Sequence, residues 1–262
     1  MTTTPATSEP ANQTYTILDR EIRLPCVVRD ATAAVAFYLV SASAAQKLIA
    51  KSGLRIAQML PGRTICTLGT MNYKDSDLGG YHEVALTFFV HEPGSRPLPL
   101  ISALLGMARG SLSAYVHWLP VNGELTCEAG RNIWGFPKFV TQIDIEAEGD
   151  TERSTLTVEG ELVLTQTVRM GGSRSFTDRT QIAYSVLDGQ LSRIPSDMSA
   201  EDLGARLGGA TLEVGTGPMA EELRSLGLPK RALFTTYMGK MSCRFYAAER
   251  TPLLSELPVP YR

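Results

Sequence analysis

The residues whose chemistry stands out in this sequence lie around Lys138. This lysine follows Gly-Phe-Pro in a run, residues 128–139, that is rich in apolar and aromatic side chains and has little nearby to neutralise an ammonium group. Lysine is rarely buried without a partner, and removal from water disfavours the charged form of an amine. A neutral amine can attack a ketone or an aldehyde, and the resulting Schiff base can accept electrons. From composition alone, the favoured interpretation is a strand lysine whose stem carries its charge to solvent.

Three segments of the sequence match the motifs of one protein family. The pattern Gly-Arg-x-x-x-Gly-Phe-Pro-Lys at residues 130–138 resembles the signature of the acetoacetate decarboxylase superfamily, in which the Schiff-base lysine follows a proline. The run Tyr-His-Glu at residues 81–83 is similar to a Tyr-x-Glu segment that supplies an active-site carboxylate. Val-Arg-Asp at residues 28–30 is similar to an early arginine segment, and the resemblance as a whole covers roughly residues 15–250.

The resemblance implies catalytic roles for Lys138 and Glu83. Lys138 would attack the substrate carbonyl and lose water to form a protonated imine, and Glu83 would face it and assist binding or proton transfer. Strand alternation places Tyr81 on the same face as Glu83 and His82 on the opposite face, so Tyr81 is the candidate proton donor. The alternative for Glu83 is an ordinary surface glutamate on a half-buried strand.

Three further residues are candidates for binding substrate. Arg29 could hold a substrate carboxylate through two hydrogen bonds, hold Glu83 in place, or form only a solvated salt bridge. Trp134 and Phe136 would form the wall of a pocket or pack as plain core.

The remaining residues of the lysine motif are expected to be structural. We expect Arg131 to pair an internal carboxylate rather than to touch substrate. Gly135 would allow close approach of the backbone or a bulge. Gly130 and Pro137 complete the motif.

The sequence departs from the best-known decarboxylases of this family at two places. They carry a second lysine directly after the nucleophile, where this chain has Phe139. They also carry a second carboxylate upstream of the glutamate, where this chain reads Cys-Thr-Leu-Gly at residues 66–69. If Lys138 lies on a strand, Phe139 points to the opposite face and need not change the pocket. The missing carboxylate indicates a substrate or a reaction that differs from the decarboxylation of acetoacetate.

Composition excludes several classes of function. The chain has 262 residues, of which 44% are hydrophobic and 20% charged, with a net charge of −2, as in an ordinary soluble enzyme. No cluster of Lys and Arg dominates, which argues against a nucleic-acid partner. No apolar stretch is long enough to span a membrane, and the N-terminus lacks the features of a signal peptide.

Cysteine and histidine usage predicts a cytoplasmic protein without a metal. The four cysteines are scattered without a CxxC motif, which is typical of reduced, buried thiols in the cytoplasm. His82, His91 and His117 share no spacing that is typical of metal ligands.

Hydrophobic periodicity predicts many short strands and few helices. We expect a disordered N-terminal tail over residues 1–14 and a single domain over residues 15–262. Helices are predicted at residues 43–51, 98–106, 197–207 and 218–226, while residues 35–40 fit either a helix or a strand. Strands are predicted at residues 63–71, 81–90, 114–120, 139–146, 155–161, 162–170, 182–187, 233–238 and 241–247, with a connection at 123–129 and a loop at 169–178.

This pattern implies an antiparallel sheet that is closed or nearly closed on itself. The family resemblance implies the same fold class, mainly β (α+β), with a barrel-like sheet and a few peripheral helices.

Three functions remain open at this point. The leading hypothesis is a lyase that decarboxylates a small β-keto acid through an imine on Lys138, and because lysine supplies the electron sink, no cofactor is required. The second uses the same imine to join a 2-oxo acid and an aldehyde by aldol condensation and dehydration. The third is a non-catalytic member of the family that binds a small carbonyl metabolite. The family resemblance also implies a homo-oligomer.

Overall fold

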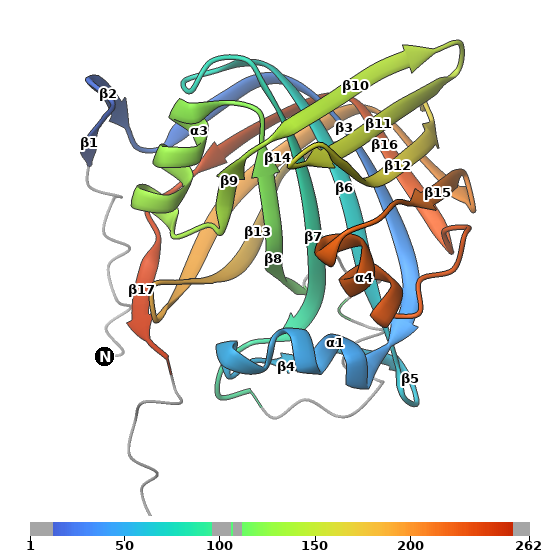
Figure 1. Ribbon diagram of the computed structural model, residues 1–262. Helices are drawn as coiled ribbons and strands as arrows, with labels where there is room; N and C mark the ends of the chain where they lie inside the picture. Colours follow the sequence, from blue (N-terminus) through green and yellow to red (C-terminus); the bar gives the residue numbers. More distant parts are fainter. Residues whose placement is uncertain (1–12, 96–105, 107–111, 254–262) are drawn as a thin grey trace, which may run out of the picture.

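The computed structural model describes residues 13–95, 106 and 112–253, and its main feature is a β-barrel (Figure 1). Strand β7 pairs with both β6 and β8, so the largest sheet closes on itself. Around the barrel the strands are β7 (Tyr81–His91), β6 (Arg63–Ser76), β3 (Cys26–Ser41), β16 (Phe234–Phe245), β14 (Gln190–Leu207), β13 (Arg174–Leu187) and β8 (Ser113–Val121). Neighbouring strands are antiparallel except β8 and β13, which are parallel.

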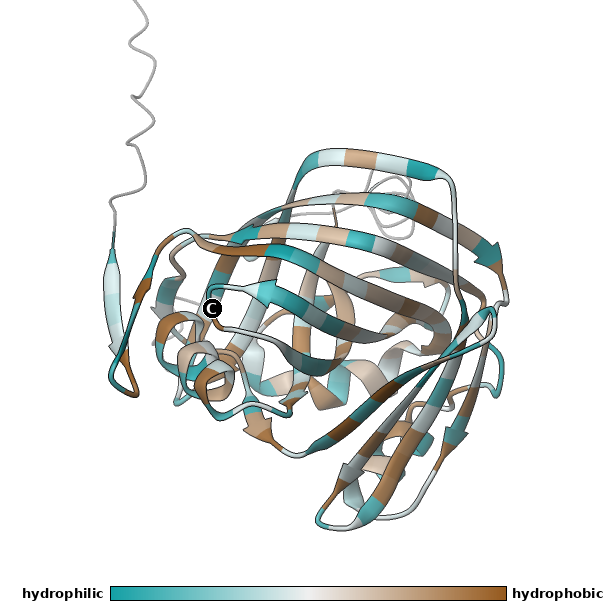
Figure 2. Cartoon of the chain, turned by 90° about the horizontal axis from the view of Figure 1, so that it is seen from above, coloured by the Kyte–Doolittle hydropathy of each residue, from teal (hydrophilic) through white to brown (hydrophobic). Residues whose placement is uncertain are grey.

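The barrel strands form because side chains of different polarity alternate along them, which Figure 2 shows as alternating bands of colour. Along β3, Ala34, Ala36 and Tyr38 belong to one buried hydrophobic cluster, whereas Ala33 belongs to another. This part of the sheet therefore buries both of its faces. One face looks into the barrel, where the candidate site lies, and the other is covered by a second sheet.

The second sheet consists of β10 (Gln142–Glu148), β11 (Thr151–Val158), β12 (Glu161–Arg169) and β15 (Ala210–Val214). Its fully buried Leu156 and Leu164 share a hydrophobic cluster with residues of β3, β6 and β7. Gln166, only 1% exposed, accepts a hydrogen bond from Tyr38 Oη at 3.3 Å and donates one to the carbonyl of Leu68 at 3.3 Å. These bonds satisfy a polar side chain whose burial would otherwise be costly.

Glu152 on β11 is also buried against the barrel and is 5% exposed. Burial raises the pKa of its carboxyl group, although hydrogen bonds from Thr70 and Thr32 and the charge of Lys74 act in the opposite direction. A carboxyl group whose pKa is higher in the folded than in the unfolded protein stabilises the fold at low pH. That contribution is lost as the pH rises through the folded pKa.

Glu152→Gln should remove this titration, because glutamine has nearly the size of the protonated side chain. We expect the variant to be more stable than the parent at about pH 8 and of similar stability near pH 4. Urea denaturation at the two pH values measures the difference. An equal change at both values, or a loss of stability at the higher one, would contradict the expectation.

Short elements surround the barrel (Figure 1). The helix α1 follows the C-terminal end of β3, and α3 follows the C-terminal end of β8. Because β3 and β8 run in opposite directions, the two helices lie at opposite ends of the barrel. Ser41 caps α1 by accepting a hydrogen bond from the amide of Ala44 at 3.3 Å. The elements are β1 (Thr14–Ile17), β2 (Arg20–Arg23), α1 (Ala42–Leu48), the 3₁₀ turn η1 (Ala50–Ser52), β4 (Arg55–Ile56), β5 (Gln58–Leu60), α3 (Glu124–Ala129), the π-helical turn η2 (Gly130–Trp134), β9 (Lys138–Val140), α4 (Pro218–Ser225) and β17 (Glu249–Pro252).

The mainly β, barrel-like fold predicted from the sequence is confirmed. The helix predicted at residues 197–207 is wrong, because this segment is the second half of β14 and pairs with β13 and β16. Asp202 has a φ of 51° and no partner in the register with β16. This irregularity separates the inward-facing Ala200 and Leu203 by three residues, a spacing that imitates a helix.

Several boundaries also differ from the sequence-based ones. The connection at residues 123–129 is mostly helical, because α3 runs from Glu124 to Ala129, and residues 35–40 belong to β3. The two strands predicted at 233–238 and 241–247 are one strand, β16, whose pairing with β3 shifts between Met238 and Met241. The loop predicted at 169–178 is shorter, since β13 begins at Arg174. The helix predicted at 98–106 lies outside the described residues except for Gly106.

The four cysteines are free and buried, as expected from their scattered positions. Within the described parts of the chain, no helix is long and apolar enough to cross a membrane. Strand β1 begins at Thr14, the last residue of the predicted tail, and residues 1–12 lie outside the described range.

Candidate active site

A compact helical connection places Lys138 at the first position of β9. After β8 the chain forms α3 and the π-helical turn η2, a rare turn that is often found at functional sites. The turn ends at Gly135, where φ is 72° and a Cβ atom would overlap Ser192 Oγ, so both the backbone and the packing require glycine. Strand β9 then runs parallel to β8, with Lys138 opposite Leu119.

Lys138 is 4% exposed, and its amine is held by three neighbours. Lys138 Nζ lies 2.7 Å from Glu83 Oε2, donates to Thr126 Oγ1 at 3.1 Å, and lies 5.2 Å from the centre of the Tyr81 ring. The neighbours of Lys138 in the sequence offer little to neutralise it, but Glu83, which the family resemblance placed opposite the lysine, supplies a carboxylate. The partners of Lys138 come from β7 and α3, which only the folded barrel brings together.

Glu83 is the partner of Lys138 and is itself held on the other side. It is 5% exposed, and its Oε1 accepts a hydrogen bond from Tyr73 Oη at 3.2 Å. Tyr73 on β6 pairs with Tyr81 on β7, and the two rings stack with centroids 4.3 Å apart. Burial, followed by the charge of Glu83, raises the pKa of both tyrosines well above the usual value. Both phenols therefore keep their protons at neutral pH and are available as donors.

Tyr73 and Thr126 are site residues that sequence reasoning did not single out. The register of the hairpin formed by β6 and β7 is the signal that could have identified Tyr73, since it places Tyr73 directly opposite Tyr81. Thr126 could have been found only by recognising residues 124–129 as a helix next to Lys138. His82 points away from the site, as the strand alternation predicts, and its Nδ1 lies 3.1 Å from the carbonyl of Ile143.

The amine of Lys138 faces a cavity of about 200 Å³ inside the barrel. Most of the residues that line it are apolar or aromatic, and they come from the barrel strands and from the segment that precedes Lys138. The described lining residues are Cys26, Val28, Ala33, Val35, Met71, Tyr73, Ser76, Leu78, Tyr81, Glu83, Ala85, Val116, Leu119, Trp134, Phe136, Lys138, Ala183, Met198, Met238, Met241, Cys243 and Phe245. Glu83 is the only acidic residue among them, which agrees with the missing second carboxylate.

Two thiols line the cavity beside the lysine. Burial is the main cause that raises the pKa of Cys26 and of Cys243 to about 12 in each case. Both groups therefore remain thiols at neutral pH, and the thiolate is the nucleophilic form of cysteine. Lys138 is accordingly the stronger candidate for a nucleophile at this wall.

The other residues of the lysine motif shape this wall. Trp134 and Phe136 are buried and line the cavity, and Trp134 Nε1 donates to the carbonyl of Tyr246 at 2.8 Å. Arg131 Nη1 donates to the carbonyl of Lys138 itself at 3.0 Å. Its expected carboxylate partner is therefore wrong, and Arg131 instead holds the backbone of Lys138. Pro137 is half-buried between Phe136 and Lys138.

Gly130 gives the stem of Lys138 its space. A Cβ atom at this position would overlap Lys138 Cδ and lie 2.7 Å from Cε. The backbone of Gly130 is right-handed helical, with φ −59° and ψ −43°, so alanine suits its conformation. The constraint at this position therefore comes from the lysine side chain.

Gly130→Ala should displace the amine of Lys138 by about 1 Å and slow adduct formation by about 100-fold, because misplacement of a reacting group has effects of this size. The fold should persist, since the alanine meets a flexible side chain. The rate of borohydride trapping at Lys138 measures the effect. Gly80→Ala is the control, because its Cβ would make only ordinary contacts of 3.4–3.5 Å. A Gly130→Ala protein that reacts at the parent rate would show that the stem has free space.

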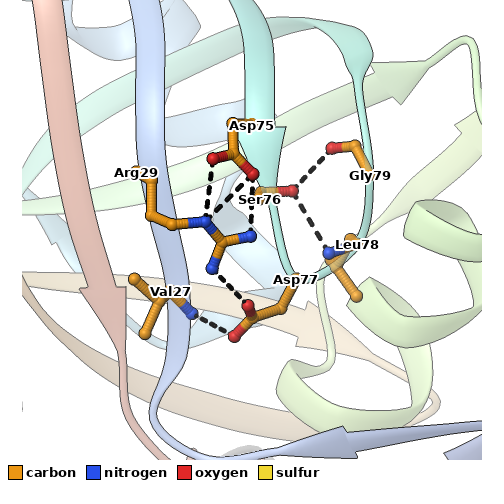
Figure 3. A network of polar contacts seen from close by, with 7 residues as sticks. All are labelled: Val27, Arg29, Asp75, Ser76, Asp77, Leu78 and Gly79. Atoms are coloured by element: carbon orange, nitrogen blue, oxygen red, sulfur yellow. Dashed lines mark hydrogen bonds and ion pairs between the residues drawn. The ribbon is translucent and has the colours of Figure 1, made fainter.

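Arg29 lies outside the cavity wall, in a polar network at its rim (Figure 3). Its guanidinium binds Asp75 through Nε and Nη2, at 2.9 and 2.8 Å, and Asp77 through Nη1 at 2.6 Å. Asp77 also accepts a hydrogen bond from the amide of Val27 at 2.9 Å. This is the salt bridge that was one of the sequence-based alternatives, and the network does not bring Arg29 to Glu83.

The network fixes the turn between β6 and β7. Ser76 Oγ donates to the carbonyl of Gly79 at 2.6 Å and accepts from the amide of Leu78 at 3.2 Å, and both Ser76 and Leu78 line the cavity (Figure 3). This turn leads directly into the strand that carries Tyr81 and Glu83, so the network braces the start of that strand.

The site thus combines a buried amine, a carboxylate in direct contact with it, and two protonated phenols in an apolar cavity. Such a set can form an imine with a carbonyl compound and can move protons to and from it. Within the described residues, no group of three His, Cys, Asp or Glu side chains could hold a metal ion.

Comparison with known proteins identifies relatives of this arrangement. The sequence profile of the acetoacetate decarboxylase family matches residues 4–243. The fold resembles acetoacetate decarboxylase from Legionella pneumophila, with a TM-score of 0.64, 14% identity, and 88% of each chain covered. It also resembles another structure of acetoacetate decarboxylase, with a TM-score of 0.60, 17% identity, and coverage of 87% of this chain and 89% of that one.

A third structure of the same fold is the enduracididine biosynthesis enzyme MppR. It has a TM-score of 0.63 and 13% identity, and the match covers 97% of this chain and 99% of MppR. At these identities the likeness concerns the fold. No curated protein matches the chain.

Proposed function

The chain belongs to the acetoacetate decarboxylase family, and from this premise we propose that it is a carbon–carbon lyase that decarboxylates a β-keto acid through an imine on Lys138. The observation that carries the proposal is the contact of 2.7 Å between Lys138 Nζ and Glu83 Oε2, in which both side chains are almost fully buried. A proton that passes along this contact leaves a free amine and a carboxylic acid next to the cavity.

Imine formation would use both members of this pair. Glu83, which then carries the proton of the ammonium group, gives it to the carbonyl oxygen as Lys138 Nζ attacks the carbonyl carbon of the substrate. The carboxylate takes a second proton from Nζ of the adduct and returns it to the hydroxyl group, so that water leaves and a protonated imine forms. Tyr73, which donates to Glu83 Oε1, holds the carboxylate during these transfers.

Loss of carbon dioxide would follow on the protonated imine. The bond between the α-carbon and the carboxylate breaks, and its electron pair moves into the imine to give a neutral enamine. The α-carbon then takes a proton from Tyr81, because Glu83 is a carboxylate once the imine has formed. Water adds to the resulting protonated imine and returns a proton to Tyr81, and the ketone then leaves Lys138 as a free amine. The proton that decarboxylation consumes overall comes from solvent. An apolar wall favours the loss of carbon dioxide, because a charged carboxylate becomes neutral carbon dioxide and the positive imine becomes a neutral enamine.

The aldolase-dehydratase remains the second candidate, because MppR has been solved with the condensation product of pyruvate and imidazole 4-carboxaldehyde. A 2-oxo acid keeps its carboxylate throughout such a reaction and needs a partner for it. Among the described lining residues the only cation is Lys138, and the positive charge of its protonated imine already has Glu83 as a partner. Decarboxylation is therefore the better match to this cavity, in which the substrate charge disappears.

Reductive trapping tests the proposal directly. The protein is incubated with acetoacetate, with longer β-keto acids or with their ketone products, in the presence of cyanoborohydride, and adducts are located by peptide mapping. We expect a single adduct on Lys138 and release of carbon dioxide in the absence of reductant. Adducts on other lysines only, or none with any compound, would exclude the imine mechanism and favour a binding protein.

The cytoplasmic location and the homo-oligomeric state also stay as proposals. Light scattering coupled to size-exclusion chromatography measures the second.

A further inference from the structure

The charge distribution of the cavity constrains what it can hold. Only Lys138 and Glu83 carry charge among the described lining residues, and each is the partner of the other at 2.7 Å. The two arginines of the family motifs are also engaged, because Arg29 is bound to Asp75 and Asp77 at the rim and Arg131 donates to the carbonyl of Lys138. The rest of the wall therefore offers a substrate no group that would pair with a second charge.

The apolar part of the wall extends around the barrel from Glu83, across the neighbouring strands. Met71 pairs with Glu83 across β6 and β7, and the same row continues to Ala33 and Met238. Ala85 lies on the same face of β7 as Glu83, two residues further along the strand, and also lines the cavity. Together with Met198 and Met241 these side chains give a wall in which flexible thioethers adapt to the shape of a ligand.

The volume of the cavity sets the size of that ligand. A dry protein cavity of about 150 Å³ binds benzene. The present cavity, at about 200 Å³, therefore has space for an apolar group somewhat larger than a benzene ring. Acetoacetate has only one methyl group beyond its ketone and would leave most of this wall without contacts.

We propose that the substrate is a carbonyl compound with an apolar alkyl or aryl body of about six to nine carbons. This body lies along the part of the wall that Met71, Met198, Met238 and Met241 form, while the carbonyl carbon meets Lys138. The proposal rests on the imine function of Lys138 and adds the substrate class. In the decarboxylation the carboxylate lies beside the carbonyl group, near Lys138. The far end of the substrate carries no charge.

A series of straight-chain methyl ketones, from acetone to 2-nonanone, tests this substrate class. Each is the ketone product of a β-keto acid of matching length. We expect the concentration for half-maximal trapping on Lys138 to fall about fourfold with each added methylene, as burial of apolar surface requires, until the cavity is full. Half-maximal concentrations that do not depend on chain length would overturn the proposal.

A pair of ketones of equal length separates polarity from size. The compounds 2-hexanone and 5-oxohexanoate differ by a carboxylate at the far end. We expect the oxo acid to be trapped at least about 100-fold less readily, because its charge would be buried without a partner. Equal trapping of the two would show that the wall accepts an anion and would contradict the proposal.

Calorimetric titration with the same ketones keeps this test independent of the chemistry. If no ketone labels Lys138, the imine function fails, but binding that strengthens with chain length and has a negative heat-capacity change would still support the apolar site. Binding without length dependence, or no binding, would overturn it.

Ala85→Leu fills part of the wall and should shift the ketone length that binds best toward shorter ketones. An unchanged best length would contradict the proposed position of the alkyl chain against this wall.

Discussion

Lys138→Arg is expected to remove both the trapped adduct and turnover while the barrel stays folded. A guanidinium group is effectively never neutral, so arginine cannot act as the nucleophile. Its positive charge still faces Glu83, so the buried carboxylate keeps a partner. A buried charge without a partner would strongly destabilise the fold. We expect the rate to fall by about 10⁶-fold or more, to the level of the uncatalysed reaction. Release of carbon dioxide, intact mass after reductive trapping, and circular dichroism measure the three quantities.

Lys240→Arg is the matched control for this substitution. Lys240 lies on β16 with a side chain that is 57% exposed, and it pairs with Glu201 at 3.4 Å. The same change in a lysine–glutamate pair at the surface should leave turnover and trapping at the parent level. Turnover by the Lys138→Arg protein within about tenfold of the parent would show that the reaction does not pass through a lysine imine.

The family motifs pointed to Lys138 and Glu83 and to their facing each other, but not to the other contacts of the pair. Composition alone favoured a strand lysine that reaches solvent. Thr126 and Tyr73 were not identified, because each meets the pair through tertiary packing of α3 and β6. For Arg29 the motif suggested a role in binding substrate, but the structure gives it other partners. Asp75 and Asp77 bind it at the rim because β3 pairs with β6, a contact that the local sequence does not reveal.

The fold follows the same division between local and long-range information. Alternating polarity predicted the strands at residues 63–71, 81–90 and 114–120, which lie within β6, β7 and β8. The irregularity at Asp202 changed the spacing of apolar residues in β14 and led to a false helix. Closure of the barrel depends on β16 joining β3 and on the parallel pairing of β8 with β13, and no local pattern encodes either contact.

The proposed mechanism requires Glu83 to accept and return protons. Glu83→Gln keeps the size of the side chain and can still hydrogen-bond to Tyr73 and Lys138, but an amide cannot accept and return a proton. The substitution also withdraws the charge that pairs with the ammonium form of Lys138, so the amine stays available for attack on a carbonyl. The two consequences oppose each other in imine formation, because the amine is free but no carboxylate moves its protons. Adducts on Lys138 should still form, although more slowly, because cyanoborohydride reduces each imine as it appears, and complete turnover should be slow.

We expect Glu83→Gln to lower the rate of carbon dioxide release by about 10²–10⁴-fold, the usual range for loss of a general acid–base. Trapping at Lys138 with a methyl ketone should persist in the same protein. Glu152→Gln is the matched control, since Glu83 and Glu152 are each 5% exposed but Glu152 lies in the interface between the two sheets, away from the cavity wall. Equal losses in the two variants would mean that burial of any glutamate matters, and normal turnover by Glu83→Gln would leave Glu83 with a structural role only. A loss of turnover confined to Glu83, with trapping that is slower but still reaches Lys138, would assign the proton transfers to this carboxylate.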